Sequence, residues 1–290
     1  MATSSFTLLP HRSVIALTGP DRVEFLQGLI SNDTTKVAAD RAIWAALLTP
    51  QGRFLNDMFV ADGGNDTFLM ETERERAAAL ARKLTMYTLR SKVKVEDRAA
   101  SMEAAVVFGD EADKALGLGK CVSYVDPRLP ALGVRVLAPA GEAAAILGAH
   151  GFLPAMPADY DALRLALGVP DGSRDLPPEK ALLLESGFDE LNGVDWKKGC
   201  YMGQELTART KYRGLVKKRL FPVRLDGPLP APGTLIERDG QEVGEIRSGV
   251  GDRALAMLRL DGVDGGGLKA GATRILPERP AWMKLPETAG

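Results

Sequence analysis

The chain has 290 residues, 45% of them apolar and 26% charged, and its formal net charge is −1. This length exceeds one compact core, so we expect two or three packed units of ordinary globular composition. The small net charge excludes a global attraction to nucleic acid or to membranes, and no apolar run approaches the roughly 20 residues that span a bilayer. The N-terminal residues show neither a secretory signal nor an Arg-rich transit peptide, so we expect a cytoplasmic protein.

The first hundred residues predict strands and helices from their apolar spacing. In chain order, strands are expected at 13–17, 42–48, 54–61 and 68–71, and helices at 22–29 and 73–84. Asp21 is the expected N-cap of the first helix. The turn Pro50-Gln51-Gly52 makes the second and third strands a hairpin.

A second α/β alternation follows, and the composition changes after Gly214. The expected elements are strands at 104–108 and 132–137, helices at 111–116, 141–150 and 160–167, and a proline-rich bend at 175–178. Short strands broken by Gly, Pro and Asp are then expected at 221–225, 234–238, 242–248 and 254–259. This last spacing predicts a small all-β unit, either a barrel or a sandwich.

The octapeptide Lys198-Gly199-Cys200-Tyr201-Met202-Gly203-Gln204-Glu205 places a cysteine in a glycine frame after two lysines. A structural cysteine usually sits in an apolar run. Here the lysines and the start of a predicted helix at 204–211 favour a thiolate, which acts as a nucleophile, ligand or redox group. A buried packing thiol is the alternative.

The second cysteine, Cys121, borders a strand, and we expect it to be structural. The two cysteines form no Cys-x-x-Cys pair, and His11 and His150 are the only histidines. No familiar metal-ligand spacing results, so we expect no metal held by this chain alone.

Residues 197–219 carry eight Lys and Arg residues against one acid, Glu205, a local net charge of 8 − 1 = +7. The segment is either a solvated face or a site for a polycarboxylate, a phosphate or an RNA backbone. Trp196, Tyr201 and Tyr212 lie among these charges and offer stacking surfaces for a flat heterocycle or a base.

Two carboxylates stand among apolar residues. Asp57 continues the alternation of the strand expected at 54–61, so it points either to solvent or into a cleft. Glu185 follows three leucines and must find hydrogen-bond donors or protonate. It either pairs with a structural arginine or recognises the donor-rich edge of a ligand.

Together these segments resemble the YgfZ-type folate-binding proteins, including the mitochondrial iron–sulfur assembly factors related to them. Those proteins are relatives of the T-protein (aminomethyltransferase) of the glycine cleavage system. The resemblance rests on residues 19–21, 25–27, 32–33, 52–57, 185–187, 192–194 and 198–209. It implies an α+β fold, with a folate-binding core of two α/β subdomains at 1–214, divided near residue 100, and a small β-barrel at 215–290.

The resemblance also implies tetrahydrofolate, or a one-carbon derivative of it, as the cofactor. Glu185 falls where the T-protein carries the glutamate that holds the pterin, and Asp57 falls near the aspartate that activates the reacting nitrogen. Tyr201 and Arg209 are the further candidates for folate binding, the arginine for the carboxylate tail. Cys200 and its octapeptide belong to the iron–sulfur branch, not to the T-protein.

Three functions follow as hypotheses. The leading one is a folate-binding accessory factor for iron–sulfur cluster assembly or maintenance, with Cys200 as its working thiol; its bacterial clients include tRNA-thiolating radical enzymes. The rival is an enzyme, a tetrahydrofolate-dependent one-carbon transferase that uses Asp57 and Glu185. A third treats the basic segment as a direct tRNA-binding surface. We expect a monomer with transient iron–sulfur protein partners and no membrane association.

Overall fold

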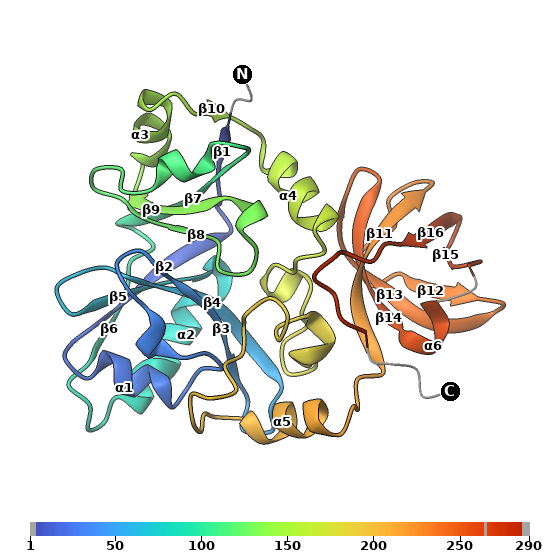
Figure 1. The fold of residues 1–290 in the computed structure, drawn as a ribbon, viewed down its shortest axis with the longest axis horizontal. Helices are drawn as coiled ribbons and strands as arrows, with labels where there is room; N and C mark the ends of the chain where they lie inside the picture. The colour runs from blue at the N-terminus through green and yellow to red at the C-terminus, as the bar shows by residue number, and fades with distance from the viewer. Residues whose placement is uncertain (1–3, 264–265, 286–290) are drawn as a thin grey trace. The chain divides into compact units, whose positions relative to one another are not determined.

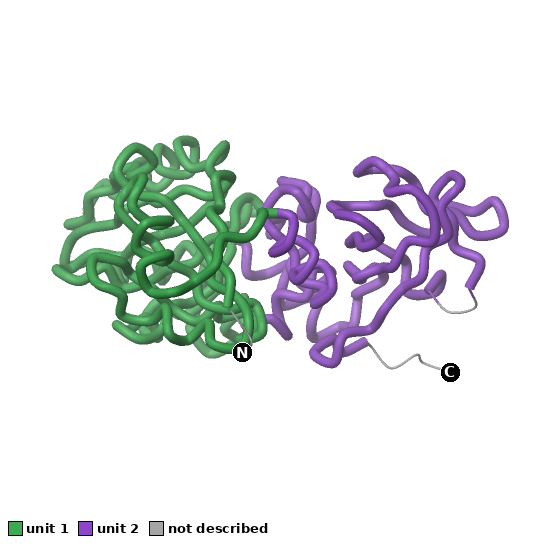
Figure 2. The backbone as a smooth tube through the Cα atoms, turned by 90° about the horizontal axis from the view of Figure 1, so that it is seen from above, with its two compact units in different colours: residues 1–50, 55–157, 192–202 green, residues 51–54, 158–191, 203–290 purple. Residues whose placement is uncertain are grey.

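A computed structural model describes residues 4–263 and 266–285. The chain divides into two compact units, which Figure 2 colours separately. The first unit is built from residues 1–50, 55–157 and 192–202, and the second from residues 51–54, 158–191 and 203–290. The second unit therefore holds more than a barrel, whereas the boundary predicted at residue 214 assigns 158–191 and 203–214 to the core.

Two five-stranded sheets form the first unit (Figure 1). The first sheet has the order β3-β4-β5-β2-β6, and the second has the order β10-β1-β7-β9-β8. The strands of the first sheet are β2 Arg12–Thr18, β3 Ile43–Leu48, β4 Phe54–Asp62, β5 Thr67–Glu73 and β6 Lys94–Asp97. Those of the second are β1 Ser5–Leu8, β7 Met102–Phe108, β8 Val122–Val125, β9 Val134–Pro139 and β10 Leu153–Pro154. The hairpin expected around the turn at residue 52 is confirmed as β3 and β4.

The helices of this unit are amphipathic, and their apolar faces pack against the sheets. They are α1 Arg22–Gln27, α2 Arg74–Tyr87 and α3 Ala143–Ala149, with short 3-10 turns at η1 Thr34–Lys36, η2 Ala112–Ala115 and η3 Pro130–Leu132. Ala77, Leu80 and Leu84 of α2 fall at helical spacing and join the core of the first sheet.

One local prediction for this unit is wrong, and another is confirmed only in part. The helix expected at 111–116 is only the single turn η2, because glycines 109, 117 and 119, all at positive φ, leave too few residues for an α-helical nucleus. Asp21 occupies the N-cap position of α1 as predicted, but its side chain makes no capping hydrogen bond. Its Oδ2 instead accepts a hydrogen bond from the backbone N–H of Lys92 at 2.7 Å.

The second unit contains a closed six-stranded barrel in the order β11-β14-β13-β12-β15-β16. Its strands are β11 Lys218–Asp226, β12 Leu235–Arg238, β13 Gln241–Val250, β14 Arg253–Arg259, β15 Lys269–Ala270 and β16 Thr273–Pro277. The remaining elements are α4 Pro157–Ala166, α5 Gln204–Tyr212, α6 Leu260–Val263, and the turns η4 Gly172–Arg174 and η5 Leu184–Ser186. The predicted C-terminal β unit is thus confirmed as a barrel.

Helix α4 is fastened to the barrel by a buried polar network and an apolar contact. Arg164 donates to Asp175 at 2.9 Å and to the Ser248 hydroxyl at 2.8 Å, and that hydroxyl donates to Asp175 at 2.5 Å. Leu165, one residue on, packs with barrel residues Leu255 and others. None of the helices within residues 4–263 and 266–285 combines the length and apolarity needed to cross a membrane.

Candidate functional site

The thiol of Cys200 is exposed on a short segment that the flanking glycines shape. Gly199 has φ +91° and Gly203 has φ +78°, a backbone region that side chains with a Cβ rarely adopt. Helix α5 starts at Gln204, with Gly203 as its N-cap residue. The helix predicted at 204–211 is therefore confirmed, and the glycine frame turns the chain so that the cysteine reaches solvent.

Lys198 anchors this segment to the end of α1 within the first unit. Its Nζ donates at 2.6 Å to the carbonyl oxygen of Gln27, the last residue of helix α1, and at 2.5 Å to that of Ile30, three residues later. The amine also lies 5.1 Å from the centre of the Tyr201 ring, which is itself buried. Burial lowers the pKa of the Lys198 amine to about 8, although Asp33 and Asp195 oppose this.

This anchoring changes the role predicted for Lys198. Sequence reasoning expects its charge to act on the thiol, but the structure directs the amine to two backbone carbonyls. Met202 adds a second tether, because its N–H donates to the Gly28 carbonyl at 3.1 Å. Lys198 and Met202 thus hold the segment on either side of Cys200 and fix where the thiol is presented. Gln204 and Glu205 lie beyond it, in the first turn of α5.

Glu185 sits in the turn η5 of the second unit as a half-buried carboxylate. Gly187, with φ +78°, ends this turn in the left-handed conformation. Among the described residues the Glu185 side chain has no hydrogen bond or ion pair. Burial raises the pKa of Glu185 above its ordinary value, and the charges of Lys218, Arg53 and Arg219 oppose this only in part. A carboxylate in this state can accept a pair of hydrogen bonds from a ligand.

Asp57 lies in the first unit, on β4, and only 2% of it is exposed. Its Oδ1 accepts from Arg12 at 3.2 Å, and its Oδ2 accepts from the indole N–H of Trp44 at 3.2 Å. Of the two orientations the sequence left open, solvent is therefore excluded. Both oxygens are engaged, so the predicted role in activating a folate nitrogen stays a prediction that requires one of these contacts to open.

Arg12 and Asp57 belong to a larger buried network that the sequence did not reveal. Glu71 accepts from Arg12 at 3.1 Å, from the Tyr124 hydroxyl at 2.9 Å and from Arg135. Burial alone would raise the pKa of Glu71, but the guanidinium groups of Arg135 and Arg12 overcome this and lower it. The only signal in the sequence is that these charges occupy positions in apolar strands.

The network joins the two sheets of the first unit. Asp126 accepts from Arg128 at 2.7 Å and from Arg135 at 3.0 Å, and all three side chains are buried. The guanidinium of Arg135 lies 4.0 Å from the centre of the Phe59 ring. Because every charge here has an opposite partner, the network stabilises the unit without an uncompensated ion.

Lys197 and Lys198 of the basic segment lie in the first unit, and its other six cations lie in the second unit, where some are paired and some are not. Lys211 pairs with Asp189 at 2.9 Å, and the buried Arg219 pairs with Glu190 at 2.8 Å. Four other side chains have no hydrogen bond or ion pair to any described residue: Arg209, Arg213, Lys217 and Lys218. Arg209, predicted to receive a folate tail, is thus exposed and available.

A cavity of about 450 Å³ lies in the first unit between η1, the start of β3 and the end of β8. Its lining includes Asn32, Lys36, Arg41, Asp126 and Asp195, but none of the side chains predicted for the site. No group of three or more His, Cys, Asp and Glu side chains suited to a metal ion occurs in the described part of the chain.

Comparison with known proteins defines the class of fold. Residues 10–136 match the GCVT N-terminal domain, and residues 217–285 match the CAF17 C-terminal beta-barrel domain. The crystal structure of the glycine cleavage system aminomethyltransferase T from Bartonella henselae has the same fold, with a TM-score of 0.74 and 17% identity. It aligns with 95% of this chain and 85% of that one. The predicted aminomethyltransferase-like α+β fold with a C-terminal barrel is confirmed.

Sequence relatives narrow the class to a family. The mitochondrial iron–sulfur cluster assembly factor IBA57 of Mus musculus is 38% identical over 89% of this chain and 78% of its own length. The Homo sapiens protein is 37% identical with the same coverage, and the Neurospora crassa homolog is 33% identical over 85% of this chain and 61% of its own. The chain therefore belongs to the IBA57 family of iron–sulfur cluster assembly factors.

The cytoplasmic localisation expected from the first residues is contradicted, because these relatives are mitochondrial proteins. Localisation is determined by short targeting signals that receptors recognise. Composition and core pattern, from which the fold follows, contain no such information.

Proposed function

We propose that this chain binds reduced folate and serves iron–sulfur cluster assembly through a transient thiol. The single observation that carries the proposal is that one chain combines a half-buried, unpaired Glu185 with an exposed Cys200 held on a fixed segment. Family membership supports the iron–sulfur part. The fold, which it shares with an aminomethyltransferase, supports the folate part.

Glu185 suits the pterin of tetrahydrofolate. The pterin edge resembles an amide and presents adjacent N–H donors, which a carboxylate receives in bidentate fashion. Hydrogen bonds from these donors would replace the hydrogen bonds to water that Glu185 loses on burial. Tyr201 is buried beneath Lys198, so its predicted contact with the folate ring is not part of the proposal; Arg209 remains a candidate for the carboxylate tail.

Cys200 can supply one ligand to an iron–sulfur cluster that is shared with, or transferred to, a partner protein. One thiolate cannot hold a cluster alone, because these clusters take about four protein ligands. An exposed thiol on an anchored segment can supply one ligand while a partner protein supplies the others. We expect the clients to be enzymes with [4Fe–4S] clusters, tRNA-thiolating radical enzymes among them.

The one-carbon transferase remains the rival, and the geometry favours it less. Its working carboxylate, Asp57, is already occupied by Arg12 and Trp44. Purified protein incubated with tetrahydrofolate and a panel of aminomethyl or methylated amine donors should form no methylenetetrahydrofolate above background. Turnover that is lost in Asp57→Asn would establish the transferase instead.

Calorimetric titration with 5-formyltetrahydrofolate tests the folate part. Glu185→Gln should weaken binding at least tenfold, because a charge-assisted pair of hydrogen bonds contributes about 1.5–3 kcal/mol. Glu237→Gln, an exposed glutamate of β12, is the matched control and should bind as the wild type does. Equal affinity for Glu185→Gln and the control would refute the assignment.

Complementation of a strain that lacks its own factor tests the thiol. Cys200→Ser should fail to restore the activity of [4Fe–4S] enzymes, whereas Cys121→Ser, which alters the half-buried cysteine packed in the second sheet's core, should restore it. Full restoration by Cys200→Ser would sink the role given to this thiol.

A further inference from the structure

We propose that an exposed basic surface of the second unit binds single-stranded nucleic acid. This surface, here called the α5–β11 surface, consists of Arg209, Tyr212, Arg213, Lys217 and Lys218. It shares no residue with the thiol segment, but Arg209 is also the candidate for the folate tail, and the charge of Lys218 acts on Glu185. Oligomer binding and the titration of Glu185→Gln with 5-formyltetrahydrofolate therefore test the two proposals by separate measurements.

This surface carries closely spaced positive charges, one of which, that of Lys218, acts on the Glu185 carboxylate. Its four cations lie within ten residues, all are exposed, and none forms a hydrogen bond or ion pair with a described residue. The whole chain has a net charge of only −1, so the surface is not a by-product of a basic protein. Cations that are held close together without partners repel one another, and a polyanion relieves this repulsion while releasing its own counterions.

The cations follow one another along the chain from the end of α5 to the start of β11. Arg209 lies in the last turn of α5, and Arg213, four residues later, is the residue that follows the helix. The chain then runs through Gly214 and Val216 to a groove of about 540 Å³ at the start of the barrel. Lys217 and Lys218 line this groove opposite Arg259, which Asp261 already neutralises at 2.6 Å. The phosphates of a nucleic-acid backbone can bind such closely spaced positive charges.

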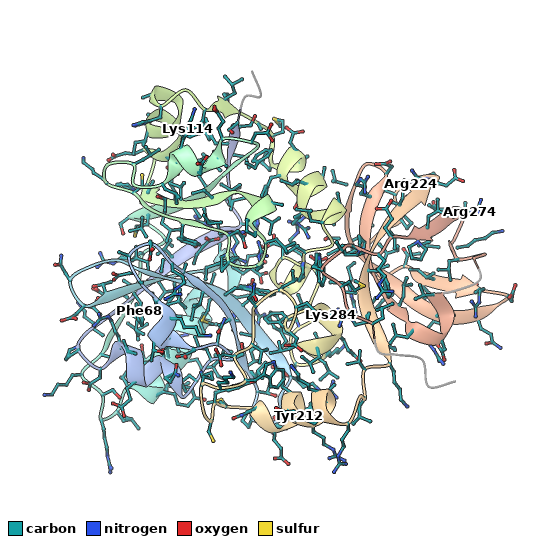
Figure 3. All side chains as sticks on the ribbon, viewed as in Figure 1. Phe68, Lys114, Tyr212, Arg224, Arg274 and Lys284 are labelled. Atoms are coloured by element: carbon teal, nitrogen blue, oxygen red, sulfur yellow. The ribbon has the colours of Figure 1, made fainter. Side chains whose placement is uncertain are left out.

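An exposed aromatic side chain favours a nucleic acid over polyanions that carry no bases. Tyr212 lies three residues after Arg209 on α5 and is 74% exposed, so its ring has not been taken into a core (Figure 3). An exposed ring among unpaired arginines offers a stacking platform to an unpaired base, and the stacking tolerates any base. Carboxylate chains and acidic protein surfaces gain nothing from such a ring.

Fluorescence anisotropy with labelled U15 RNA and dT15 DNA tests the proposal on the full-length protein. Four neutralised phosphates give a slope of about −3 in log K against log salt, so raising salt from 50 to 200 mM should weaken binding about 50-fold. The double variant Lys217→Gln/Lys218→Gln should halve the slope and lose only about sevenfold over this range. The two oligomers show whether RNA or DNA binds more tightly.

Two comparisons separate nucleic acid from polyanions in general. Tyr212→Ala should weaken oligomer binding at least fivefold, because stacking contributes about 1–3 kcal/mol per base. The same variant should leave the binding of poly-γ-glutamate unchanged. Arg224→Gln/Arg274→Gln is the matched control: it removes the same charge from exposed barrel positions, both labelled in Figure 3, and should change neither.

Three results would overturn the proposal: no oligomer binding at 50 mM salt, a salt slope equal in the Lys217/Lys218 variant and the control, or equal oligomer affinity with and without the Tyr212 ring. The last result, together with tight binding of poly-γ-glutamate, would assign the surface to carboxylate chains. Loss of 5-formyltetrahydrofolate binding in Glu185→Gln bears only on the proposed function.

Discussion

The amine of Lys198 links the stability of the first unit to pH. Its pKa is about 8 in the folded chain, against an ordinary value of 10.5. Between these values the unfolded chain holds the proton and the folded chain has released it, so folding stability must rise with pH. Replacing the side chain by methionine removes this titration and keeps much of its apolar volume.

The size of the effect follows from the two pKa values. Integrating the difference in bound protons from pH 7.5 to 9.5, at 1.36 kcal/mol per unit, gives about 2 kcal/mol. The free energy of unfolding of the wild type should therefore gain about 2 kcal/mol over Lys198→Met in this interval. Taking the difference cancels the titration of the other groups, which both proteins share.

Urea unfolding followed by tryptophan fluorescence at the two pH values measures this difference. Lys197→Met removes an exposed amine next door and is the matched control, for which we expect the wild-type pH dependence. The ¹³Cε resonance of Lys198 should titrate near pH 8 in the folded protein. A stability difference that stays constant with pH, together with a titration near 10.5, would refute the buried setting of the amine.

Three further predictions follow from buried or exposed side chains. Glu71→Gln should lower the free energy of unfolding by about 3–5 kcal/mol in chemical denaturation, because it leaves buried guanidinium groups uncompensated; a loss below about 1 kcal/mol would contradict the network. Gly187→Ala should lower the melting temperature, because its Cβ would lie 2.9 Å from the Trp282 ring at a φ of +78°; unchanged melting would contradict this packing. Cys200 should react with a disulfide reagent in the native state much faster than the half-buried Cys121, whose pKa burial raises; equal rates would contradict the exposed thiol segment.

Much of the fold could be predicted because its longer strands are largely apolar and its longest helix buries one face. The mainly apolar segments 42–48 and 54–61 predict β3 and β4, which are buried along nearly their whole length, and the spacing in 73–84 predicts α2. Elements without such a pattern were missed. β1 and β10 have four and two residues, too few to show a period, and each exists only because another strand supplies its hydrogen bonds.

The residues of the candidate site could likewise be predicted from local sequence only in part. Cys200 stood out because local features, two glycines and a polar surround, are enough to predict an exposed, shaped segment. Glu185 stood out because an isolated carboxylate in an apolar run must find hydrogen-bond donors or protonate. The partner of each charge could not be predicted. Lys198 binds carbonyls about 170 positions earlier in the chain, and Glu71 meets Arg135 from the other sheet.

The sequence by itself determined that the chain ends in an all-β unit, and its resemblance to a known family predicted the fold class and the barrel that the structure confirms. It also singled out Cys200 and Glu185 as candidates, because glycine positions, the octapeptide and an isolated carboxylate are properties of neighbouring residues. Only the tertiary structure decided what the charges do. It directed Lys198 to the end of α1, enclosed Asp57 between Arg12 and Trp44, and left Glu185 without an ion pair among the described residues. The reason is physical. The protonation and pairing of a buried charge depend on the groups that the folded chain brings within a few ångströms, and those groups come from distant parts of the sequence.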